Sequence, residues 1–520
     1  MIRRTLCLLL LAALQPQEPA GTTGPELLTF DELVLLNEKE PDEALKKKVD
    51  ALLTTPFIGN AAHLAQVQPH RPNVVTIGPA LRVTEWNIER GENFDLIRLA
   101  FTDPDAFEKA FMKEQKEVTP QLLEAKQQSV YMKESDVLIL NEVDYGMART
   151  EYRDVARELA EALGMNYAYG VEFLEVDSIY LGTEELIDPD EKTREQFKKD
   201  IAVDKTRYKG MHGTAILSRY PIVSARSLRF HVCYDWYTTE KDEISKLEKG
   251  RRLAADKLFL ERIGREVRRG GRMALIADIA VPDSPTKTVT IVAAHLENKC
   301  KPECRVEQMN QLLKELERVK HPLVLGGDLN TTGADGAPTS IWREVKKRVR
   351  NPEFWASQAI TWFSPVAIPK MFSVPGNYFK NYHDPSATHV PFVAPNKEAA
   401  LFDAMEKFRF AGGTSFDYAG DPLRSINARG GKLSASNERG AKGFSTTFSF
   451  KRDLKGIAGR MRLDWLLVKP VGDDGNHPFH FAPYFGRTME ALNMAVPDQI
   501  SDHHPITVDL PLLPEPPKKQ

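Results

Sequence analysis

Hydrophobic residues recur along the chain at two spacings, one typical of helices and one typical of strands. Apolar residues three or four positions apart predict helices within residues 25–66, 105–132, 151–164 and 304–319. Alternating or short continuous apolar runs predict strands over residues 81–91, 136–143, 212–218, 272–281, 287–298, 321–332 and 462–470, and after Pro505. The pattern loosens between residues 331 and 460, which we interpret as loops and small elements beside a functional site.

Several predicted strands begin or end in polar side chains that suit chemistry better than burial. These are Asn87, Glu142, His295, Asp328, Asn330, Asp464, Asp502 and His503. Each alone is more simply a turn residue, and "SDHH" at residues 501–504 alone favours a polar loop before a strand. Eight such residues are harder to dismiss, because carboxylates gathered at one sheet edge without a cation would repel one another.

The chemistry that these residues suit is hydrolysis of a phosphate ester. Oxygen donors such as Glu142 fit a hard cation, and Mg²⁺ binds through one or two carboxylates plus substrate phosphate. No protein nucleophile with an adjacent base is evident, so a His paired with an Asp would activate water. The sequence therefore predicts a Mg²⁺-dependent hydrolase, with Mn²⁺ or Ca²⁺ as alternative ions.

Seven motifs then resemble those of a known superfamily. "TEWNIERG", "LILNEV", "HGTAILSRYPI", "VAAHLEN", "LGGDLNTT", "LDWLLV" and "SDHHP" follow the order found in the endonuclease/exonuclease/phosphatase superfamily, whose members resemble pancreatic deoxyribonuclease. The match runs in separated blocks from Pro79 to Leu512. The resemblance implies an α/β fold, a four-layered sandwich of two mixed β-sheets flanked by helices, with the site at one rim.

The resemblance also implies a role for each of the eight residues. Asn87, Glu142 and Asp502 match metal-site positions, with Glu142 as the principal ligand. His295 matches a histidine that stabilises or protonates at the phosphate, and Asp328 with Asn330 matches a pair that orients water and phosphate. His503 matches the general base and Asp464 the acid that aligns it, whereas His504 matches no role.

Composition limits the partners. The 520 residues are 42% hydrophobic, enough for a large core, and the net charge of -3 excludes a global basic field that would attract nucleic acid. An anionic substrate must therefore be held locally. No apolar stretch is long enough to predict a transmembrane helix, and the sequence does not indicate an oligomeric state.

The motifs and the composition of the ends divide the chain into four parts. Residues 1–20, with Arg3, Arg4 and a Leu-rich run, predict a signal peptide and hence a secreted or periplasmic protein. Residues 21–78 predict an N-terminal helical extension, and residues 79–512 a catalytic domain with a long insertion at about 331–460. Shorter charged insertions are expected at 177–209 and 234–269, and residues 513–520 form a Pro-rich tail.

Three cysteines follow the predicted signal peptide. In an oxidising compartment Cys300 and Cys304 could close a short loop and leave Cys233 unpaired. Two buried thiols explain the same pair equally well, because spacing alone does not show the geometry of a bridge.

The leading hypothesis is an exported, metal-dependent phosphodiesterase or nuclease. A phosphomonoesterase or a sphingomyelinase-like phospholipid headgroup hydrolase would use the same site, and the motifs do not select among these substrates. A noncatalytic binding protein on the same fold is the third alternative, but a pure binder has no need of both His503 and Asp464.

Overall fold

A computed structural model describes residues 22–74, 77–112, 118–177, 203–241, 266–284, 286–333, 399–417, 439–440, 443–444, 447–449, 460–469, 483–486, 488–495 and 499–512. The predicted signal peptide, the tail and most of the 331–460 insertion lie outside these ranges. None of the helices within the ranges combines the length and apolar character needed to cross a membrane.

The larger sheet contains ten strands within the described residues, in the order β1-β2-β6-β7-β5-β4-β18-β17, with β3 beside β4 and β9 beside β6. Its strands β4 and β5 are parallel, and their other neighbours are antiparallel, so the sheet is mixed. The bounds are β1 Thr22–Thr23, β2 Phe57–Gly59, β3 Asn73–Val74, β4 Gly78–Arg90, β5 Val137–Tyr145, β6 Asn166–Glu175, β7 Met211–Ser218, β9 Arg268–Gly270, β17 Tyr484–Phe485 and β18 Ile506–Pro511.

The second sheet contains six described strands in the order β15-β16-β12-β11-β10-β8. It is also mixed, because β11 and β12 are parallel while β10 and β16 run antiparallel to their partners. The bounds are β8 Ile222–Arg229, β10 Met273–Ala280, β11 Thr288–His295, β12 Leu323–Gly333, β15 Phe448–Ser449 and β16 Arg460–Lys469. A separate ribbon pairs β13 Arg439–Gly440 with β14 Gly443–Phe444.

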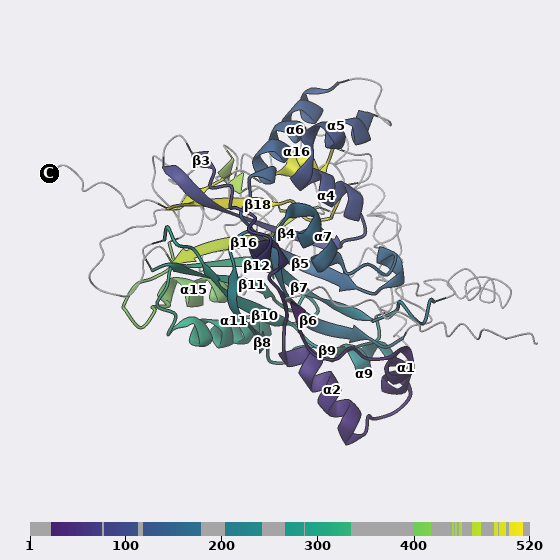
Figure 1. Ribbon diagram of the computed structural model, residues 1–520. Helices are drawn as coiled ribbons and strands as arrows, with labels where there is room; N and C mark the ends of the chain where they lie inside the picture. The colour runs from purple at the N-terminus through teal and green to yellow at the C-terminus, as the bar shows by residue number, and fades with distance from the viewer. Residues whose placement is uncertain are drawn as a thin grey trace, which may run out of the picture.

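Three hydrophobic clusters show how the layers stack. The middle cluster joins inward residues of both sheets, such as Val83, Ile139, Ile291 and Leu466. One outer cluster packs helices against the larger sheet, and the other packs helices against the smaller sheet. Helices α4 to α7 and α16 accordingly lie on one side of the paired sheets and α11 and α15 on the other (Figure 1). The predicted four-layered α/β sandwich is confirmed.

Helices occur in each of the four stretches that the sequence pattern predicts, and one of these stretches is divided. The helices are α1 Phe30–Glu38, α2 Glu43–Thr54, α3 Ala61–Leu64, α4 Phe94–Thr102, α5 Pro104–Met112, α6 Pro120–Lys133, α7 Val155–Leu163, α9 Trp236–Lys241, α11 Pro302–Leu316, α15 Ala399–Lys407 and α16 Glu490–Asn493, with a 3₁₀ turn at Ala148–Thr150. The helical stretch expected over residues 105–132 is divided, because Thr119 caps a new helix and Pro120 occupies its first turn.

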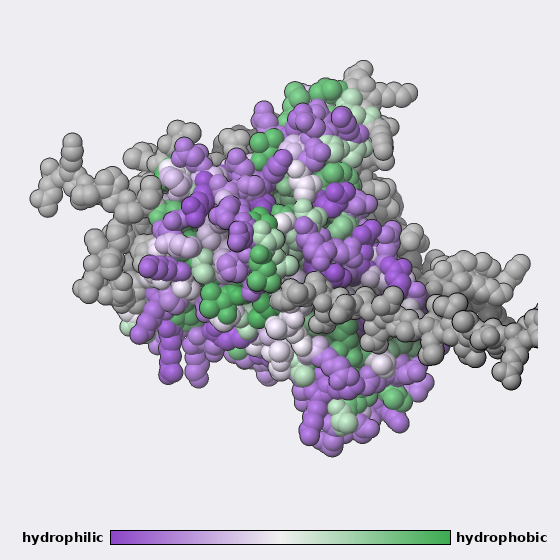
Figure 2. Space-filling model, in the orientation of Figure 1, coloured by the Kyte–Doolittle hydropathy of each residue, from purple (hydrophilic) through white to green (hydrophobic). Residues whose placement is uncertain are grey.

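The N-terminal segment contains the expected helices and also joins the larger sheet. A capping box between Thr29 and Glu32 starts α1, and Asp42 caps α2. Strand β2 then pairs with β6, while leucines of both helices enter the same core as β6. This segment therefore shares a core with the strands that follow it. Figure 2 shows that the outward side of α2 is hydrophilic, whereas hydrophobic residues gather over α5 and α6.

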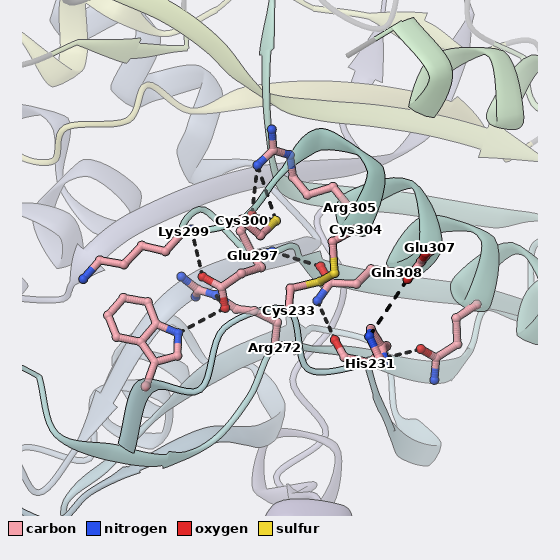
Figure 3. Close-up of a disulfide and its surroundings, with 12 residues drawn as sticks. His231, Cys233, Arg272, Glu297, Lys299, Cys300, Cys304, Arg305, Glu307 and Gln308 are labelled. Atoms are coloured by element: carbon pink, nitrogen blue, oxygen red, sulfur yellow. Dashed lines mark hydrogen bonds and ion pairs between the residues drawn. A yellow bond between two sulfur atoms is a disulfide. The ribbon is translucent and has the colours of Figure 1, made fainter. Parts of the chain in front are cut away.

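The cysteine pairing differs from the loop expected between Cys300 and Cys304. A disulfide joins Cys233, in the segment after β8, to Cys304 on α11, with Cα atoms 6.0 Å apart (Figure 3). The Sγ atom of Cys300 instead lies 3.4 Å from the carbonyl oxygen of Glu297. The sequence pattern did not show that the segment after β8 folds back onto α11.

Candidate active site

Strands β4, β5 and β12 each contain an irregularity near the predicted site residues. Their pairing registers shift between Asn87 and Arg90, between Leu140 and Val143, and after Asp328. Left-handed backbone conformations occur in the same places, with φ of 65° at Arg90, 52° at Glu142 and 46° at Asn330. Such bulges re-aim side chains beside active sites, and they cost energy in residues other than glycine. The strands therefore continue beyond Asn87, Glu142 and Asn330, where the sequence pattern had suggested that they end.

His503 and Asp464 form a buried pair. Nδ1 of His503 lies 2.7 Å from Oδ2 and 3.0 Å from Oδ1 of Asp464. The indole N–H of Trp86 donates to the carbonyl oxygen of His503 at 2.9 Å, and the hydroxyl of Ser501 accepts from the His503 N–H. Burial alone would lower the pKa of His503, but Asp464, Asp502 and Asp328 raise it well above its usual value.

Asp328 lies at the centre of the predicted residues. Its Oδ1 accepts the backbone N–H of Asn330 at 2.8 Å, while its Oδ2 accepts from the amides of Asn330 at 3.1 Å and Asn87 at 3.3 Å. Asn141 fixes the backbone, because its Oδ1 accepts the Asp328 N–H. Just before it, Gly327 has φ of 144°, and a Cβ there would collide with the carbonyl of Ala294.

His295, the last residue of β11, is the second histidine close to Asp328. Its Nε2 lies 3.6 Å from Oδ2 of Asp328. Its Nδ1 contacts Oε1 of Glu172 at 3.1 Å and Nη1 of Arg272 at 2.8 Å. Burial alone would raise the pKa of Glu172, but His295 and Arg272 lower it. Glu172 on β6 and Arg272, just before β10, are two residues that the sequence interpretation missed.

The donor set fits a divalent cation. A carboxylate oxygen of Glu142, a ring nitrogen of His295 and a carboxylate oxygen of Asp328 all lie within 4.8 Å of one another. The Nε2 atom of His295 is buried and has no hydrogen-bond partner within the described residues, so no protein group competes with a cation for it there. Burial alone would raise the pKa of Glu142, but Arg90, His212 and His295 lower it to about 2, which keeps this ligand ionised.

The other two predicted metal residues lie at the margin of this cluster. Asn87 donates to Asp328 and accepts the Glu89 N–H at 3.1 Å, so its amide is already oriented. Oδ1 of Asp502 is 3.9 Å from Nε2 of His503, on the general-base side. Glu142, Asp502 and Glu89 are partly exposed, whereas His295, Asp328 and Asp464 are buried.

One further residue follows His503 in the sequence, and another interacts with Asp464. His504 is buried away from the cluster, where its Nδ1 accepts from the amide of Asn493 at 2.9 Å. Glu85 on β4 is fully buried, and neither of its oxygens has a hydrogen-bond partner within the described residues. Burial, together with Asp464 and Asp328, raises the pKa of Glu85 well above its usual value.

The sequence model of the Endonuclease/Exonuclease/phosphatase family matches residues 85–503, most of the chain. The chain belongs to this family. Members of the endonuclease/exonuclease/phosphatase family hydrolyse phosphate-ester bonds. The family depends in general on divalent metals, in agreement with the donor set of Glu142, His295 and Asp328.

Solved structures of this family also align with the chain. An endonuclease/exonuclease/phosphatase from Beutenbergia cavernae is 16% identical, with a TM-score of 0.36, and the alignment covers 84% of this chain and 72% of the other. A 3'-5' exonuclease from Neisseria meningitidis is 12% identical, with a TM-score of 0.35 and coverage of 82% and 99%. The human Nocturnin catalytic domain is 14% identical, with a TM-score of 0.32 and coverage of 85% and 99%. No curated protein matches the chain.

Proposed function

We propose that this family member is an exported, Mg²⁺-dependent phosphodiesterase that cleaves nucleic acid. The observation that carries the proposal is the convergence of His503, His295 and Asp328, with Nε2 atoms of both histidines 3.7 and 3.6 Å from Oδ2 of Asp328. Oδ2 of Asp328 thus lies near the base His503, which is paired with Asp464, and near the cation donors Glu142 and His295.

The residues divide the chemistry between them. Nε2 of His503 takes the proton of the attacking water, and Asp464 holds the ring in the orientation required and stabilises the imidazolium. Asn330 and Asn87, held by Asp328, orient the water and the phosphate. Glu142, His295 and Asp328 would hold the metal, which supplies charge stabilisation at the phosphate oxygens when bound.

The charges of the partly exposed residues favour a diester over a monoester. Glu142, Asp502 and Glu89 are acids, and the partly exposed Arg90 balances only one of their charges. A phosphodiester carries one negative charge and a monoester close to two at neutral pH, so a monoester meets the stronger repulsion. This argument supports a phosphodiesterase, and a nucleic acid supplies the diester in polymeric form.

Export is supported by two features. The arginine pair and Leu-rich run at residues 3–14 have the layout of a signal peptide. The disulfide between Cys233 and Cys304 suits an oxidising compartment. N-terminal sequencing of the protein recovered from a cell fraction tests this part, and intact Met1 on cytoplasmic protein would contradict it.

The activity is tested with a substrate panel of plasmid DNA, RNA, bis-p-nitrophenyl phosphate, p-nitrophenyl phosphate and sphingomyelin. Each is offered with Mg²⁺, Mn²⁺ or Ca²⁺ and with excess chelator, beside the Asp464→Asn protein as a control for contaminating nuclease. We expect metal-dependent cleavage of DNA or RNA and of the aryl diester. Preference for the monoester or for sphingomyelin, or undiminished cleavage in chelator, would overturn the proposal.

A further inference from the structure

Beside the disulfide, a second group of metal-binding side chains lies outside the candidate active site. Ligand atoms of His231, Cys304 and Glu307 all lie within 4.8 Å of one another, and Nε2 of His231 is 3.9 Å from Oε2 of Glu307. Cys233 is bonded to Cys304 and brings a second sulfur to the same place. Figure 3 shows His231 and Glu307 together beside the bridge. The group therefore offers one nitrogen, one oxygen and two sulfurs.

Two segments supply these ligands in pairs. His231 and Cys233 are two residues apart in the segment after β8. Cys304 and Glu307 are three residues apart on α11, a spacing that places them on one face of the helix. Zinc sites commonly draw two closely spaced ligands from each of two segments. The pattern is therefore that of a zinc site whose two sulfurs are joined as a disulfide.

The segment that carries His231 is held on α11 by contacts other than the disulfide. The amide of Gln308 donates to the carbonyl oxygen of His231 at 2.9 Å, and Gln311 accepts the His231 N–H at 2.9 Å. Gln311 also donates to the carbonyl oxygen of Arg229 at 2.7 Å, and Phe230 packs in the hydrophobic cluster that contains the apolar face of α11. Opening the bridge would thus free the sulfurs without releasing the segment.

The geometry suits a tetrahedral ion. A Zn–S bond of about 2.3 Å and a Zn–N bond of about 2.0 Å place neighbouring ligand atoms about 3.3 to 3.8 Å apart. The Cα atoms of Cys233 and Cys304 are 6.0 Å apart, so rotation about the two Cα–Cβ bonds can bring free sulfurs to that separation. Both cysteines are partly exposed, and His231 and Glu307 are exposed, so a reductant and an ion can reach them.

We propose that reduction of the disulfide converts this group into a Zn²⁺ site, in which both thiolates, His231 and Glu307 are the ligands. Thiolate and imidazole donors in a tetrahedral arrangement favour Zn²⁺ over Mg²⁺, which prefers oxygen donors in an octahedron. The ion and the bridge are then alternative links between α11 and the segment after β8.

A thiol reductant balances the exchange. Two thiol groups of the reductant give up two electrons and two protons and become joined as a disulfide, while Cys233 and Cys304 become thiols. Zn²⁺ then displaces both thiol protons to solvent, because the thiolate is the form that binds a metal. Since the ion binds only the reduced form, it opposes re-formation of the bridge.

The test is a titration of Co²⁺, a coloured substitute for Zn²⁺, into oxidised protein and into protein reduced with a phosphine that is then removed. We expect the reduced protein alone to show thiolate-to-cobalt charge-transfer absorption, and Zn²⁺ should displace the cobalt. The donor set of Glu142, His295 and Asp328 contains no thiolate, so an ion held there gives no such absorption.

Variants identify the ligands. His231→Ala should weaken Co²⁺ binding by more than the roughly 10- to 100-fold that loss of an outer-shell partner costs, and His63→Ala, an exposed histidine on α3, is its matched control. Glu307→Gln should weaken binding less, because water can take the fourth position. Cys304→Ser should lower both the affinity and the absorption, whereas Cys300→Ser removes a thiol outside the group and should change neither.

A redox titration supplies a second readout. Saturating Zn²⁺ should lower the concentration of reduced glutathione at which half of the bridges are open, and His231→Ala should diminish that shift. Near-UV circular dichroism of the reduced, metal-free protein checks that the segment stays packed, because the buried Trp236 follows Cys233 by three residues. None of these measurements uses hydrolysis, so they do not depend on the proposed function.

Charge-transfer absorption in the oxidised protein, its absence from the reduced protein, or unchanged Co²⁺ affinity in His231→Ala or Glu307→Gln would overturn the proposal. A glutathione midpoint that Zn²⁺ does not shift would overturn it as well. Loss of the near-UV signal on reduction would have the same result, because the ligands would no longer be held together.

Discussion

His295 and His503 direct their Nε2 atoms at the same oxygen, Oδ2 of Asp328, from 3.6 and 3.7 Å. His295 ends β11 of the smaller sheet, and His503 lies just before β18 of the larger one. The candidate site is therefore assembled only when the two sheets pack face to face. His503 is also bridged to Phe448 of β15, so the segment before β18 is tied directly to the smaller sheet at this point.

The pair of His503 and Asp464 should behave as one unit. General-base catalysis contributes about 10²- to 10⁴-fold, so His503→Ala should lower kcat by roughly that factor. Asp464→Asn should cost a similar factor, and the double variant little more, because residues that act together are non-additive. Steady-state kinetics on the preferred substrate measure this, and additive losses would separate the two roles.

His504→Ala serves as the contrast to that pair. His504 is buried and accepts from Asn493. Its loss should lower the free energy of unfolding by about 1–3 kcal/mol through an unsatisfied amide, while kcat falls far less than in His503→Ala. An inactive but stable His504→Ala protein would show that the base has been assigned to the wrong histidine.

The pH profile should follow the ionisation of His503. A general base must be neutral, and the acids around His503 raise its pKa well above 6.5, so kcat/KM should rise with pH and level off only above that value. Asp464→Asn removes the strongest attraction for the proton and should move this limb to lower pH. A limb that stays in place in Asp464→Asn would assign the titration to another group.

Metal binding should depend on Glu142. Glu142→Gln replaces an ionised ligand of the cluster with a neutral amide, so Mn²⁺ affinity measured by calorimetry should fall together with activity. Glu151→Gln, an exposed carboxylate outside the cluster, is the control. Equal metal affinity in Glu142→Gln and the wild type would remove Glu142 from the metal site.

Asp136, which lies outside the candidate site, should make the free energy of unfolding depend on pH. Burial raises its pKa from 3.8 to about 6, although the His70 and Arg71 backbone N–H groups lower it. The folded state then keeps a proton that the unfolded chain has lost, so stability present below pH 3.8 is lost as pH rises through 6. At 1.36 kcal/mol per unit the loss is at most about 3 kcal/mol.

Urea denaturation of wild type and Asp136→Asn at several pH values measures this loss. The free energy of unfolding of the wild type should fall relative to that of the variant between pH 4 and 7. A constant difference between the two proteins over that range would show that Asp136 titrates normally.

The disulfide should stabilise the fold by restricting the conformations of the unfolded chain. It spans a sequence separation of 71 residues, for which the loop-entropy relation gives about 4 kcal/mol at most. Cys233→Ser should lower the free energy of unfolding by up to that amount, whereas Cys300→Ser should leave it almost unchanged. A large loss in Cys300→Ser would restore the pairing that the sequence suggested.

Much of the fold could be predicted because the strands that carry the site contain recognisable apolar runs. The pattern around Asn87, Glu142 and Asp328 placed each of these residues at a strand, and the resemblance ordered the strands. It did not show that β4, β5 and β12 continue past them through bulges, because a bulge depends on pairing between distant segments.

Glu172 and Arg272 were missed for a related reason. The sequence interpretation did not include β6, where Glu172 lies inside a run of buried residues rather than at the end of the strand. Arg272 read as part of a charged segment. The pairing of Met273 with His295 places Arg272 beside that histidine, whereas Glu172 lies in the other sheet and reaches it only when the sheets pack together. Local sequence does not contain that information.

The left-handed backbone at Glu142 carries a consequence for engineering. A glycine adopts that conformation without penalty, so Glu142→Gly would relieve roughly 1 kcal/mol of strain while removing the carboxylate from the cluster. The greater entropy of glycine in the unfolded chain and the lost attraction to Arg90 offset that gain, so a screen for heat resistance alone would be nearly blind to the loss of this side chain. A thermostability campaign on this enzyme needs an activity screen in every round.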